Sequence, residues 1–518
     1  MKEFKNEVYT DFKNEEKRKE MEKVLENVEK DFGKEHDIVI GGKRIKLAEK
    51  FVSINPSKKD QVIGVFQKGD EKTGDLALNT AWEAFKTWKN VSQEKRAEYL
   101  FKIAETIRRK RLEFDSYLVF ETGKNWLEAD ADVAEAIDFC EYYGADSLKY
   151  GKVFDMPTFD NEKDELVYIP LGAGAVIPPW NFPLAILVGM TTSSIVTGNT
   201  IVLKPASDAA YIATKFMEVL EEVGLPDGVV NLVTGPGPVV GDYLVKHPKT
   251  RFISFTGSKD VGLGIVEEAG KHREGQIWIK RVVAEMGGKN AIIVEDDANI
   301  NSAVEGCYAS AFGFQGQKCS ALSRLLLHEK IYDEFLNKFV EKTKNTKIGQ
   351  TKYYENYLGP VINETAYKKV LNYIEVGKKD GKILAGGEPD ENKDGYFIKP
   401  TIIELNDTNS RVWREEIFGP VVAVLKYKNF EEAVKLFNDT EYGLTGSIYT
   451  KDKEKINIAK KELHCGNLYI NRKCTGAMVG AHPFGGFNMS GTDSKTGSPD
   501  HLLLFLQAKA IGEYLGNW

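Results

Sequence analysis

The longest uncharged stretch of this chain, Leu166 to Leu203, sets the strongest limit on its fold. It is long enough to cross a bilayer. Prolines and glycines interrupt any continuous membrane helix, and they are Pro170, Pro178, Pro179, Pro183, Gly172, Gly174 and Gly189. A strand, an irregular turn and a buried helix, covered on both sides as in α/β proteins, fit the stretch better. We therefore expect no membrane partner.

Short β-rich runs alternate with helical patterns along much of the chain, which is typical of βαβ units and parallel sheets. The runs are 174–177, 200–203, 229–233, 251–255, 291–294, 325–327, 421–425 and 447–449. Two α/β halves are predicted, with a seam near 285–290. Residues 14–35 show the spacing of an amphipathic helix. The polar, alternating segment 151–169 predicts a hairpin that protrudes from the first half.

Charge and cysteine usage exclude several classes of function. A net charge of −7 argues against nucleic acid or an anionic membrane surface as partner, because both need a basic face. The five cysteines form no CxxC pair, which argues against a disulfide framework and a recognisable zinc site. No metal is expected. The first residues contain no apolar signal segment, so a cytoplasmic location is expected.

Two glycine-containing turns follow β-rich runs and are candidates for phosphate binding. Gly235–Gly241 has the spacing GxGxxxG, one residue longer than the usual dinucleotide fingerprint, and a plain tight turn also explains it. Thr256-Gly257-Ser258 opens a helical pattern, where free N–H groups can face a pyrophosphate. Ser258 adds a hydroxyl donor there, or serves only as a helix N-cap.

Cys319 differs from the other cysteines in its surroundings. It lies among glycine and polar residues beside Lys318. A neighbouring cation and free backbone N–H groups favour the thiolate, which is the nucleophilic form. Cys140 and Cys307 lie on helical patterns and fit a buried structural role. A buried small residue remains the alternative for Cys319.

Glu285 and Asn181 are the candidates for a general base and an oxyanion donor. Glu285 precedes two glycines at the predicted seam, where a carboxylate can act on water, and a surface loop glutamate is the alternative. Asn181 lies between prolines that stiffen the backbone. Its amide can then donate to a developing oxyanion, unless it forms an Asx turn instead.

Taken together, these motifs resemble the aldehyde dehydrogenase superfamily over about residues 40–510. Seven motifs occur in the family order, which is far more specific than any one of them. They are Ile177–Pro183, Gly198–Ser207, Phe255–Gly262, Glu285–Asn290, Gly316–Ser320, Glu415–Val421 and Pro483–Gly486. The chain is most similar to the branch that oxidises L-glutamate γ-semialdehyde, which equilibrates with 1-pyrroline-5-carboxylate. That similarity is carried by Arg281–Lys289, Gln315–Ala321, Asn471–Ala477 and Pro483–Thr496.

The resemblance implies an α/β fold of the aldehyde dehydrogenase type. Its parts are a Rossmann-type coenzyme domain, an α/β catalytic domain and a small β oligomerisation element. We expect residues 1–150 and 170–287 to form the NAD-binding domain and residues 288–490 the catalytic domain. Residues 151–169 and 491–518 would form the oligomerisation element. A homo-oligomer, dimeric or larger, is therefore expected.

The resemblance also implies an NAD(P)-dependent oxidation to L-glutamate through a cysteine thioester, in proline and arginine catabolism. The Cys319 thiolate attacks the aldehyde carbon, and the Asn181 amide with the Cys319 N–H holds the oxyanion. After hydride transfer to the nicotinamide, Glu285 activates the water that hydrolyses the thioester. Neither a metal nor a catalytic histidine is required.

Eight cofactor-binding residues follow from the resemblance, namely Trp180, Lys204, Ser207, Gly237, Gly257, Ser258, Glu416 and Phe418. Lys204 and Ser207 would lie by the adenosine ribose. Gly257 and Ser258 would lie near the pyrophosphate, and Glu416 would accept from the nicotinamide ribose. Many NAD-preferring relatives have glutamate where Ser207 stands, and a carboxylate there would repel a 2′-phosphate. We predict NAD as the main cofactor, with measurable use of NADP.

Six substrate-binding residues follow in the same way, namely Glu135, Phe182, Ser320, Gly476, Ala477 and Phe484. Ser320, Gly476 and Ala477 would bind the α-carboxylate, largely through N–H groups. Phe182 and Phe484 would line the aliphatic part of the substrate. Glu135 would meet the substrate ammonium, or else lie on an exposed helix face.

Three other functions remain as alternatives. Another semialdehyde dehydrogenase, acting on succinic semialdehyde or an aminoaldehyde, is the nearest, and the loop Arg472–Gly480 argues against it. A thiol hydrolase would use Cys319 without a cofactor, and NADH formation distinguishes it. A catalytically silent binding protein is disfavoured because Cys319, Glu285 and Asn181 are all present.

Overall fold

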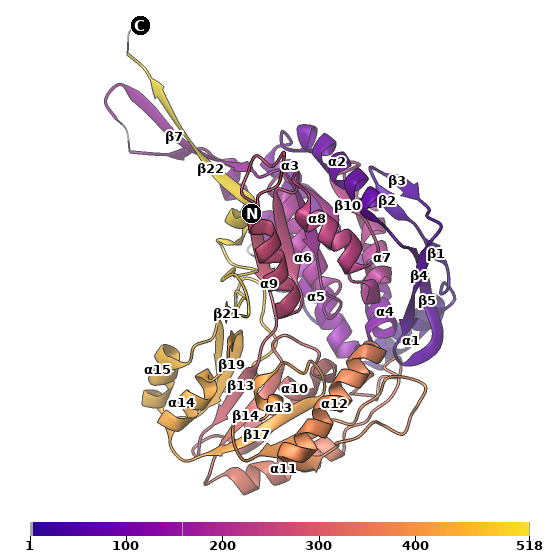
Figure 1. Cartoon of the computed structure of the whole chain (residues 1–518), viewed down its shortest axis with the longest axis vertical. Helices are drawn as coiled ribbons and strands as arrows, with labels where there is room; N and C mark the ends of the chain where they lie inside the picture. The colour runs from indigo at the N-terminus through magenta and orange to yellow at the C-terminus, as the bar shows by residue number, and fades with distance from the viewer. Residues whose placement is uncertain (1–3, 158, 517–518) are drawn as a thin grey trace.

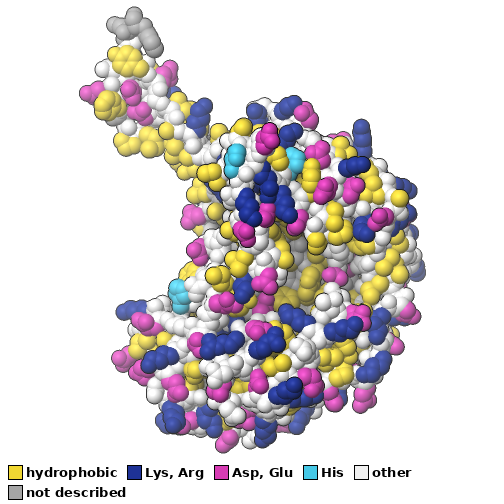
Figure 2. All heavy atoms as spheres, in the orientation of Figure 1, with side chains coloured by type: hydrophobic (Ala, Val, Ile, Leu, Met, Phe, Trp, Pro, Cys, Tyr) yellow, Lys and Arg dark blue, Asp and Glu magenta, His cyan; other side chains and the backbone are white. Residues whose placement is uncertain are grey.

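Two sheet-centred lobes and a projecting β arm make up the computed structural model, which describes residues 4–157 and 159–516 (Figure 1). The surface is hollowed where the two lobes meet (Figure 2). Each lobe contains a seven-stranded, mostly parallel sheet with helices on both faces. Within these residues, no helix is both long and apolar enough to cross a bilayer.

The sheet of the first lobe has five parallel strands and an antiparallel pair at one edge. In spatial order its strands are β12 (Arg281–Glu285), β11 (Phe252–Thr256), β8 (Ala173–Ile177), β9 (Thr200–Leu203), β10 (Val230–Leu232), β2 (Ile38–Ile40) and β3 (Lys43–Ile45). The uncharged stretch supplies β8, β9 and the buried helix between them, as predicted.

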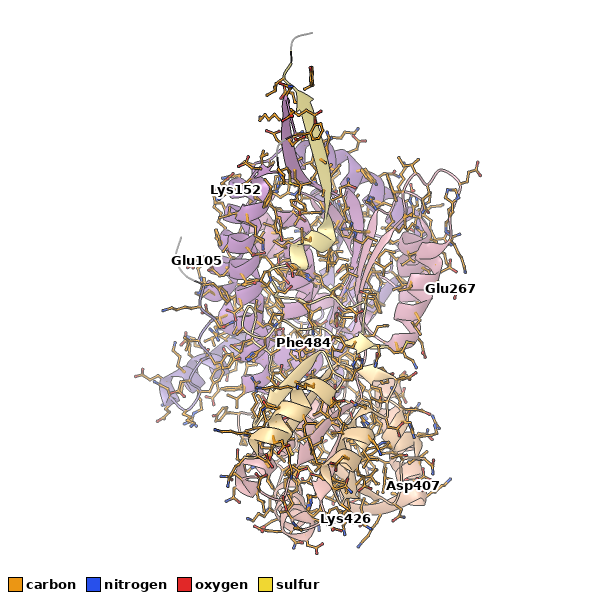
Figure 3. All side chains as sticks on the ribbon, turned by 90° about the vertical axis from the view of Figure 1, so that its left-hand side faces the viewer. Glu105, Lys152, Glu267, Asp407, Lys426 and Phe484 are labelled. Atoms are coloured by element: carbon orange, nitrogen blue, oxygen red, sulfur yellow. The ribbon has the colours of Figure 1, made fainter. Side chains whose placement is uncertain are left out.

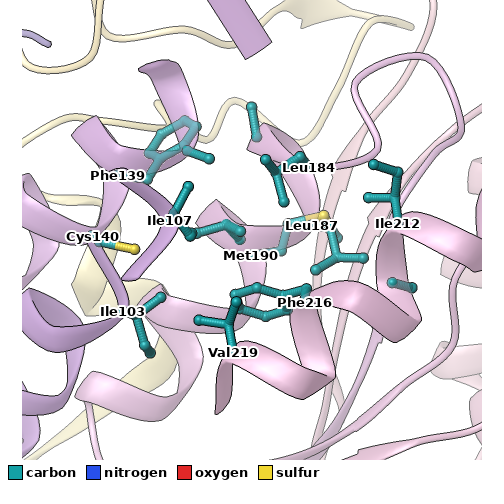
Figure 4. Close-up of a cluster of buried hydrophobic side chains, with 14 of the residues drawn as sticks. Ile103, Ile107, Phe139, Cys140, Leu184, Leu187, Met190, Ile212, Phe216 and Val219 are labelled. Carbon is teal, nitrogen blue, oxygen red and sulfur yellow. The ribbon is translucent and has the colours of Figure 1, made fainter. Parts of the chain in front are cut away.

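Alternate residues of these strands enter two separate cores, because both faces of the sheet are covered. Ala173, Ala175 and Val202 pack toward α2 (Glu71–Trp88) and α8 (Asp242–Lys246). Val176 and Ile201 face the opposite core. Figure 4 shows part of that core, formed by α3 (Gln93–Arg109), α5 (Trp126–Ser147), α6 (Ala185–Val196) and α7 (Ala210–Glu222). The remaining helices are α4 (Arg111–Thr122), beside α5, and α9 (Lys259–Gly270), against β12.

The second lobe is built on six parallel strands and one antiparallel edge strand. Their order is β15 (Gly381–Ala385), β16 (Thr401–Leu405), β17 (Val421–Tyr427), β14 (Leu322–His328), β13 (Asn290–Val294), β19 (Thr445–Tyr449) and β20 (Asn467–Ile470). One core includes α10 (Ile300–Phe312) and α11 (Tyr332–Lys344). The other includes α12 (Glu364–Asp380), α13 (Arg411–Arg414), α14 (Phe430–Asn438) and α15 (Lys453–Glu462).

The arm is a three-stranded antiparallel sheet that joins segments far apart in the sequence. It contains β6 (Phe154–Asp155), β7 (Glu162–Pro170) and β22 (Leu506–Tyr514). β22 pairs with β7 along its whole length, from Leu506 opposite Pro170 to Tyr514 opposite Glu162. The predicted hairpin is thus present, and the C-terminal segment adds a third strand to it. The arm projects away from both lobes (Figure 1).

The segments before α2 wrap the first lobe. The helix predicted over residues 14–35 is α1 (Glu15–Glu29), and the Asn14 side chain caps it by accepting from the N–H groups of Glu16 and Lys17. It ends earlier than predicted because Gly33 turns the chain with φ 77° into β1 (Glu35–His36). β1 pairs with β5 (Lys58–Gln67), which also pairs with β4 (Lys50–Asn55). A short pair, β18 (Tyr442–Gly443) with β21 (Phe487–Asn488), lies in the C-terminal part.

Candidate active site

The predicted cofactor residues lie at the carboxyl ends of parallel strands of the first sheet. Trp180 follows β8, Lys204 and Ser207 follow β9, and Gly237 follows β10. Gly257 and Ser258 follow β11, and Glu285 is the last residue of β12. Because parallel strands end at one edge of the sheet, these residues share one rim, which is where open α/β sheets bind ligands.

The loops after β9 and β10 meet at this rim. The Ser207 hydroxyl donates to the Gly235 carbonyl over 3.4 Å. Lys204 is almost fully buried, and its Nζ donates to the Pro205 carbonyl at 3.0 Å. Burial lowers the pKa of Lys204 to about 8. Gly237 is exposed and opens a single π-helical turn, where an added Cβ would meet nothing within 4 Å.

Ser258 occupies the N-cap position of α9, but its side chain makes no capping hydrogen bond. The capping explanation for this serine is therefore wrong. Its hydroxyl and the first N–H groups of the helix face the rim without intrahelical acceptors. Gly257 is half-buried beside it, and a Cβ there would lie 2.5 Å from the Phe255 ring. A larger residue than glycine does not fit at this turn.

The second lobe contributes Glu416 and Phe418 to the same region. Glu416 Oε1 accepts from the Gly288 N–H at 2.9 Å, and burial raises the pKa of Glu416. Phe418 has a left-handed backbone, with φ 59°, and its ring lies 5.4 Å from that of Trp180 in an edge-to-face arrangement. This contact joins the two lobes beside the rim.

These features fit a dinucleotide. An uncapped helix N-terminus and an unengaged Ser258 hydroxyl suit a pyrophosphate. The open backbone at Gly237 allows close approach, and Ser207 offers a hydroxyl beside it. Glu416 offers a carboxylate on the side of the second lobe. The described part of the chain therefore has the groups that NAD binding requires.

Cys319 lies at the end of an unusual loop between α10 and β14. Three consecutive residues, Phe314, Gln315 and Gly316, adopt left-handed backbone conformations with φ 49°, 56° and 66°. Such strain is held only where the surroundings over-determine it. The Asn290 amide clamps the loop by donating to the carbonyls of Cys319 at 2.7 Å and Ala321 at 2.8 Å.

The surroundings of Cys319 do not favour its thiolate, contrary to the sequence-based expectation. Burial and the nearby carboxylates, Glu416 and Glu285 foremost, raise the pKa of the Cys319 thiol to about 12. The Ser320 N–H lowers it, but by less. Lys318, expected to assist, instead places its Nζ 2.6 Å from Glu128 Oε2. Its charge is balanced within that pair.

Glu285 is half-buried at the end of β12, and its carboxylate is closely surrounded by backbone. The Ser494 hydroxyl donates to Oε1 at 2.9 Å, whereas Oε2 has no hydrogen-bond partner. Burial raises the pKa of Glu285 to about 8, although the bonds from Ser494 and the Gly486 N–H lower it. A group that titrates near neutral pH suits a general base. The exposed-loop alternative for Glu285 is wrong.

Asn181 is 4% exposed and reaches across to the Cys319 loop. Its Nδ2 donates to the Gln317 carbonyl at 3.1 Å, two residues before the cysteine. The amide thus contacts a distant segment rather than its own turn. α6 follows directly, and the Asp132 carboxylate of α5 accepts from the Ala185 N–H at 2.7 Å, which fixes the start of α6. The hydrogen bond to Gln317 and the fixed start of α6 together position Asn181.

The three reacting candidates therefore converge. The Asn181 amide donates a hydrogen bond to the loop that carries Cys319, and the charge of Glu285 raises the pKa of the Cys319 thiol. A Cβ at Gly288 would lie 2.5 Å from the Cys319 carbonyl, so the segment after β12 packs directly on the cysteine. The three segments meet where both lobes face each other.

Glu135 lies on α5 close enough for its charge to act on Cys319, and the exposed-face alternative for it is wrong. It is half-buried, and burial together with Asp132 raises its pKa to about 8. Its charge also contributes to the raised pKa of Cys319. Phe182 lies nearby, with the fully buried Lys124 Nζ 3.8 Å from its ring centre.

Ser320 and the loop that carries Gly476 and Ala477 are held together by Cys474. The Cys474 thiol donates to the Ser320 carbonyl at 3.4 Å. Gly476 has φ 74°, a conformation that favours glycine, and Arg472 donates to its carbonyl at 2.8 Å. Phe484 lies where the two lobes meet (Figure 3), paired through its backbone with Thr496.

Several residues of the site were not predicted. Asn290 and Ser494 lie inside predicted motifs, but only contacts between distant segments show what they hold. A row of carboxylates on α5, namely Glu128, Asp132 and Glu135, recurs at helical spacing, which the sequence does contain as a signal. Lys124 pairs with Asp132 at 3.3 Å with both side chains fully buried, and the sequence gave no hint that a lysine so close to the start of α5 would be buried.

Comparison with known proteins places these features in context. A model described as the aldehyde dehydrogenase family matches residues 19–511. A 1-pyrroline-5-carboxylate dehydrogenase of Geobacillus sp. (strain WCH70) is 52% identical over 510 residues, which are 98% of this chain and 99% of that protein. A solved 1-pyrroline-5-carboxylate dehydrogenase from Thermus with bound NAD superimposes with TM-score 0.98 at 46% identity, covering 99% of each chain. Proline utilization A from Bdellovibrio bacteriovorus gives TM-score 0.97 at 42% identity over 99% of this chain and 53% of that one.

Proposed function

Because this chain belongs to the aldehyde dehydrogenase family, we propose that it is an NAD-dependent 1-pyrroline-5-carboxylate dehydrogenase. Its reaction is the oxidation of L-glutamate γ-semialdehyde to L-glutamate in proline and arginine catabolism. The observation that carries the proposal is the convergence of Cys319, Glu285 and Asn181 beside a rim suited to a dinucleotide. The names of relatives that match along nearly their whole length support the substrate.

Cys319 is the proposed nucleophile. Its thiol proton passes to water, its sulfur forms a bond to the aldehyde carbon, and the carbonyl electron pair moves to the oxygen. The Asn181 amide and the Cys319 N–H are the proposed donors to that oxyanion, each contributing about 3 kcal/mol in comparable sites. NAD bound at the rim supplies the two-electron acceptor. Eight residues are proposed to bind NAD, namely Trp180, Lys204, Ser207, Gly237, Gly257, Ser258, Glu416 and Phe418.

Glu285 is the proposed base for hydrolysis of the thioester on Cys319. The carboxylate takes a proton from water, the water oxygen bonds to the acyl carbon, and the carbon–sulfur bond breaks. With a pKa of about 8, Glu285 is partly ionised near neutral pH and can accept that proton. Ser494 holds the carboxylate, and its other oxygen, Oε2, is left for water.

Substrate recognition divides between two ends of a small amino acid aldehyde. We propose that Ser320, Gly476 and Ala477 bind the α-carboxylate, because their small side chains leave the backbone accessible to an anion and Cys474 holds the two segments together. Glu135 is the proposed partner of the ammonium group. Phe182 and Phe484 are proposed to flank the aliphatic part.

The domain division and assembly follow the same reasoning. Residues 1–150 and 170–287 are proposed to bind NAD, residues 288–490 to carry catalysis, and residues 151–169 with 491–518 to join subunits into a homo-oligomer. A cytoplasmic location is proposed because all five cysteines are free thiols, which suits a reducing compartment.

Steady-state assays with a panel of aldehydes test the proposal. L-glutamate γ-semialdehyde, succinic semialdehyde, an aminoaldehyde and propanal are compared by kcat/KM, each with NAD and with NADP. We expect the first aldehyde to be preferred, with NAD favoured and NADP measurably used because Ser207 carries no charge. Glu135→Ala is expected to raise KM for the semialdehyde about tenfold, which is 1.4 kcal/mol, without changing KM for propanal.

Each result has a contrary outcome. Preference for succinic semialdehyde would assign the enzyme to another branch of the family. No detectable NADP turnover would refute dual cofactor use. An equal rise of KM for L-glutamate γ-semialdehyde and for propanal in Glu135→Ala would refute the proposed contact between Glu135 and the substrate ammonium.

A further inference from the structure

A segment before α1 contacts both walls of the proposed substrate site. We call residues 4–13 the N-terminal strap. It has no regular secondary structure over most of its length and crosses α5 and the loop after β20. The second of these, residues 471–480, is here called the carboxylate loop because it carries Gly476 and Ala477.

Asn6 is the residue of the strap that joins the two walls. Its Nδ2 donates to Asp138 Oδ2 of α5 at 2.8 Å and to the Val479 carbonyl of the carboxylate loop at 3.0 Å. Asp138 lies about one turn beyond Glu135 on the same helix. Val479 follows Ala477 by two residues. One amide thus connects the proposed ammonium site to the proposed carboxylate site.

The strap itself is firmly fixed to the first lobe. The Glu7 N–H donates to Asp138 Oδ1 at 2.7 Å, and the Thr10 N–H and hydroxyl donate to the two oxygens of Asp130 at 2.7 and 2.6 Å. Phe12 is 1% exposed and packs edge-to-face on Trp126. Asn6 is therefore held between two anchored residues rather than at a loose end.

The carboxylate loop is fixed by other segments near its beginning and near its end. Cys474 fixes its beginning through Ser320 and Ser310. Near its end, the Tyr9 hydroxyl lies 3.5 Å from Met478 Sδ, and a Cβ on Gly480 would meet the rings of Tyr142 and Phe4. Strap residues thus contact the loop at Met478, Val479 and Gly480, where Val479 is also buried in the core of the first lobe and the Gly480 N–H donates to the Gly497 carbonyl at 3.2 Å.

We infer that Asn6 is a specificity-determining positioning residue, which fixes the carboxylate loop at the distance from α5 that an amino acid aldehyde requires. This inference rests on the proposed function. Asn6 itself touches no reacting atom. Its loss should weaken recognition of the substrate's charged ends and spare the chemistry at Cys319.

The test compares Asn6→Ala and Asn6→Asp with Lys5→Ala, an exposed neighbour in the strap. Asn6→Ala is expected to raise KM for L-glutamate γ-semialdehyde about tenfold, while kcat, KM for propanal and KM for NAD change less than about twofold. Asn6→Asp is expected to have a larger effect, because it places a second carboxylate against Asp138. Lys5→Ala should behave as the unaltered enzyme.

Hydrogen exchange gives a readout that needs no substrate. Faster exchange of the amides of residues 476–480 in Asn6→Ala, with NAD binding unchanged, is expected. Unchanged exchange there, or an equal rise of KM for both aldehydes, would overturn the inference. Asn6→Ser, which keeps a donor, should be intermediate and serves if Asn6→Asp does not fold. If the unaltered enzyme does not oxidise the semialdehyde, the proposed function fails, while exchange still reports on the strap.

Discussion

At the scale of single residues, the charges near the thiol are mostly negative. Glu416, Glu285 and Glu135 all raise the pKa of Cys319, and the nearest lysine in sequence is paired with Glu128. The thiol is therefore protonated near neutral pH in the protein alone. A protonated thiol is a poor nucleophile, so the proposed attack of Cys319 requires that this proton is removed first.

Ser494 offers a direct test of how Glu285 is tuned. Its hydroxyl is the side-chain donor to that carboxylate, and removing it removes an interaction that lowers the pKa of Glu285. The base must be ionised to act, and Ser494→Ala should raise the pKa of Glu285. The ascending limb of the plot of kcat against pH should therefore move to higher pH in this variant. Because a hydrogen bond to a charged group is worth about 1.5 kcal/mol, the shift should be about one pH unit.

The profile is measured by NADH formation between pH 6 and 10 (roughly the range around the expected pKa of the base). Ser498→Ala, a buried serine whose hydroxyl accepts from the Asp500 N–H, is the matched control and should leave the limb in place. A limb that stays in place in Ser494→Ala would show that Ser494 does not act through Glu285.

At the scale of elements, the loop before Cys319 depends on a left-handed turn. Gly316 has φ 66°, and a Cβ there would lie 2.3 Å from the Gly419 carbonyl. No side chain can be added without moving the backbone of the second lobe. The adjacent Gln315 amide donates to the carbonyls of Gly123 and Pro360, which fixes the loop from outside.

Gly316→Ala should therefore lower the free energy of unfolding by about 2–4 kcal/mol and reduce kcat severely, because Cys319 would be displaced. Urea unfolding and NADH formation measure the two effects. Gly264→Ala in α9, where a Cβ would meet nothing within 4 Å, is the control. It should be neutral or slightly stabilising. Equal effects of both substitutions would refute the role assigned to this turn.

Elements were predictable where local pattern decides them, and contacts were not. The strands β8, β9 and β11 follow from apolar runs bounded by turn residues, and the motifs after them locate the rim. The left-handed run at Phe314 and Gln315 had no local signal, because neither residue favours that conformation. The engagement of Lys318 by Glu128 was missed for a similar reason, since the pair is 190 residues apart.

At the scale of the whole molecule, the arm exposes an unusual number of large apolar side chains. They are Val153, Phe154, Met156, Phe159, Ile169, Ile511, Tyr514 and Leu515. β22 also forms an outer edge of its sheet. A projecting three-stranded sheet with an open edge and apolar surface is not expected to remain solvated. This supports the proposed self-association.

Deletion of residues 507–518 should therefore shift the protein to a monomer, because it removes most of β22 and leaves β7 without its long partner. Sedimentation velocity of the full chain and the truncated chain measures the change. Lys509→Ala, an exposed position on the same strand, should keep the mass of the full assembly. An unchanged mass after truncation would place the subunit contact elsewhere.

The overall architecture was largely predictable, because alternating βα patterns and seven ordered motifs constrain the whole chain together. The projection of residues 151–169 was predicted from its polar alternation, and only the family resemblance grouped it with the C-terminal segment, because its pairing with β22 joins segments more than 300 residues apart. The position of the N-terminal strap was not predictable, since its contacts are single side chains such as Asn6.

The most direct test of the account is NADH formation from L-glutamate γ-semialdehyde by the unaltered enzyme and by Cys319→Ala. The substitution removes only the sulfur, so the variant should still bind NAD. We predict sustained NADH formation by the unaltered enzyme and none above background by Cys319→Ala. A Cys319→Ala enzyme that binds NAD and still forms NADH at a comparable rate would contradict the account.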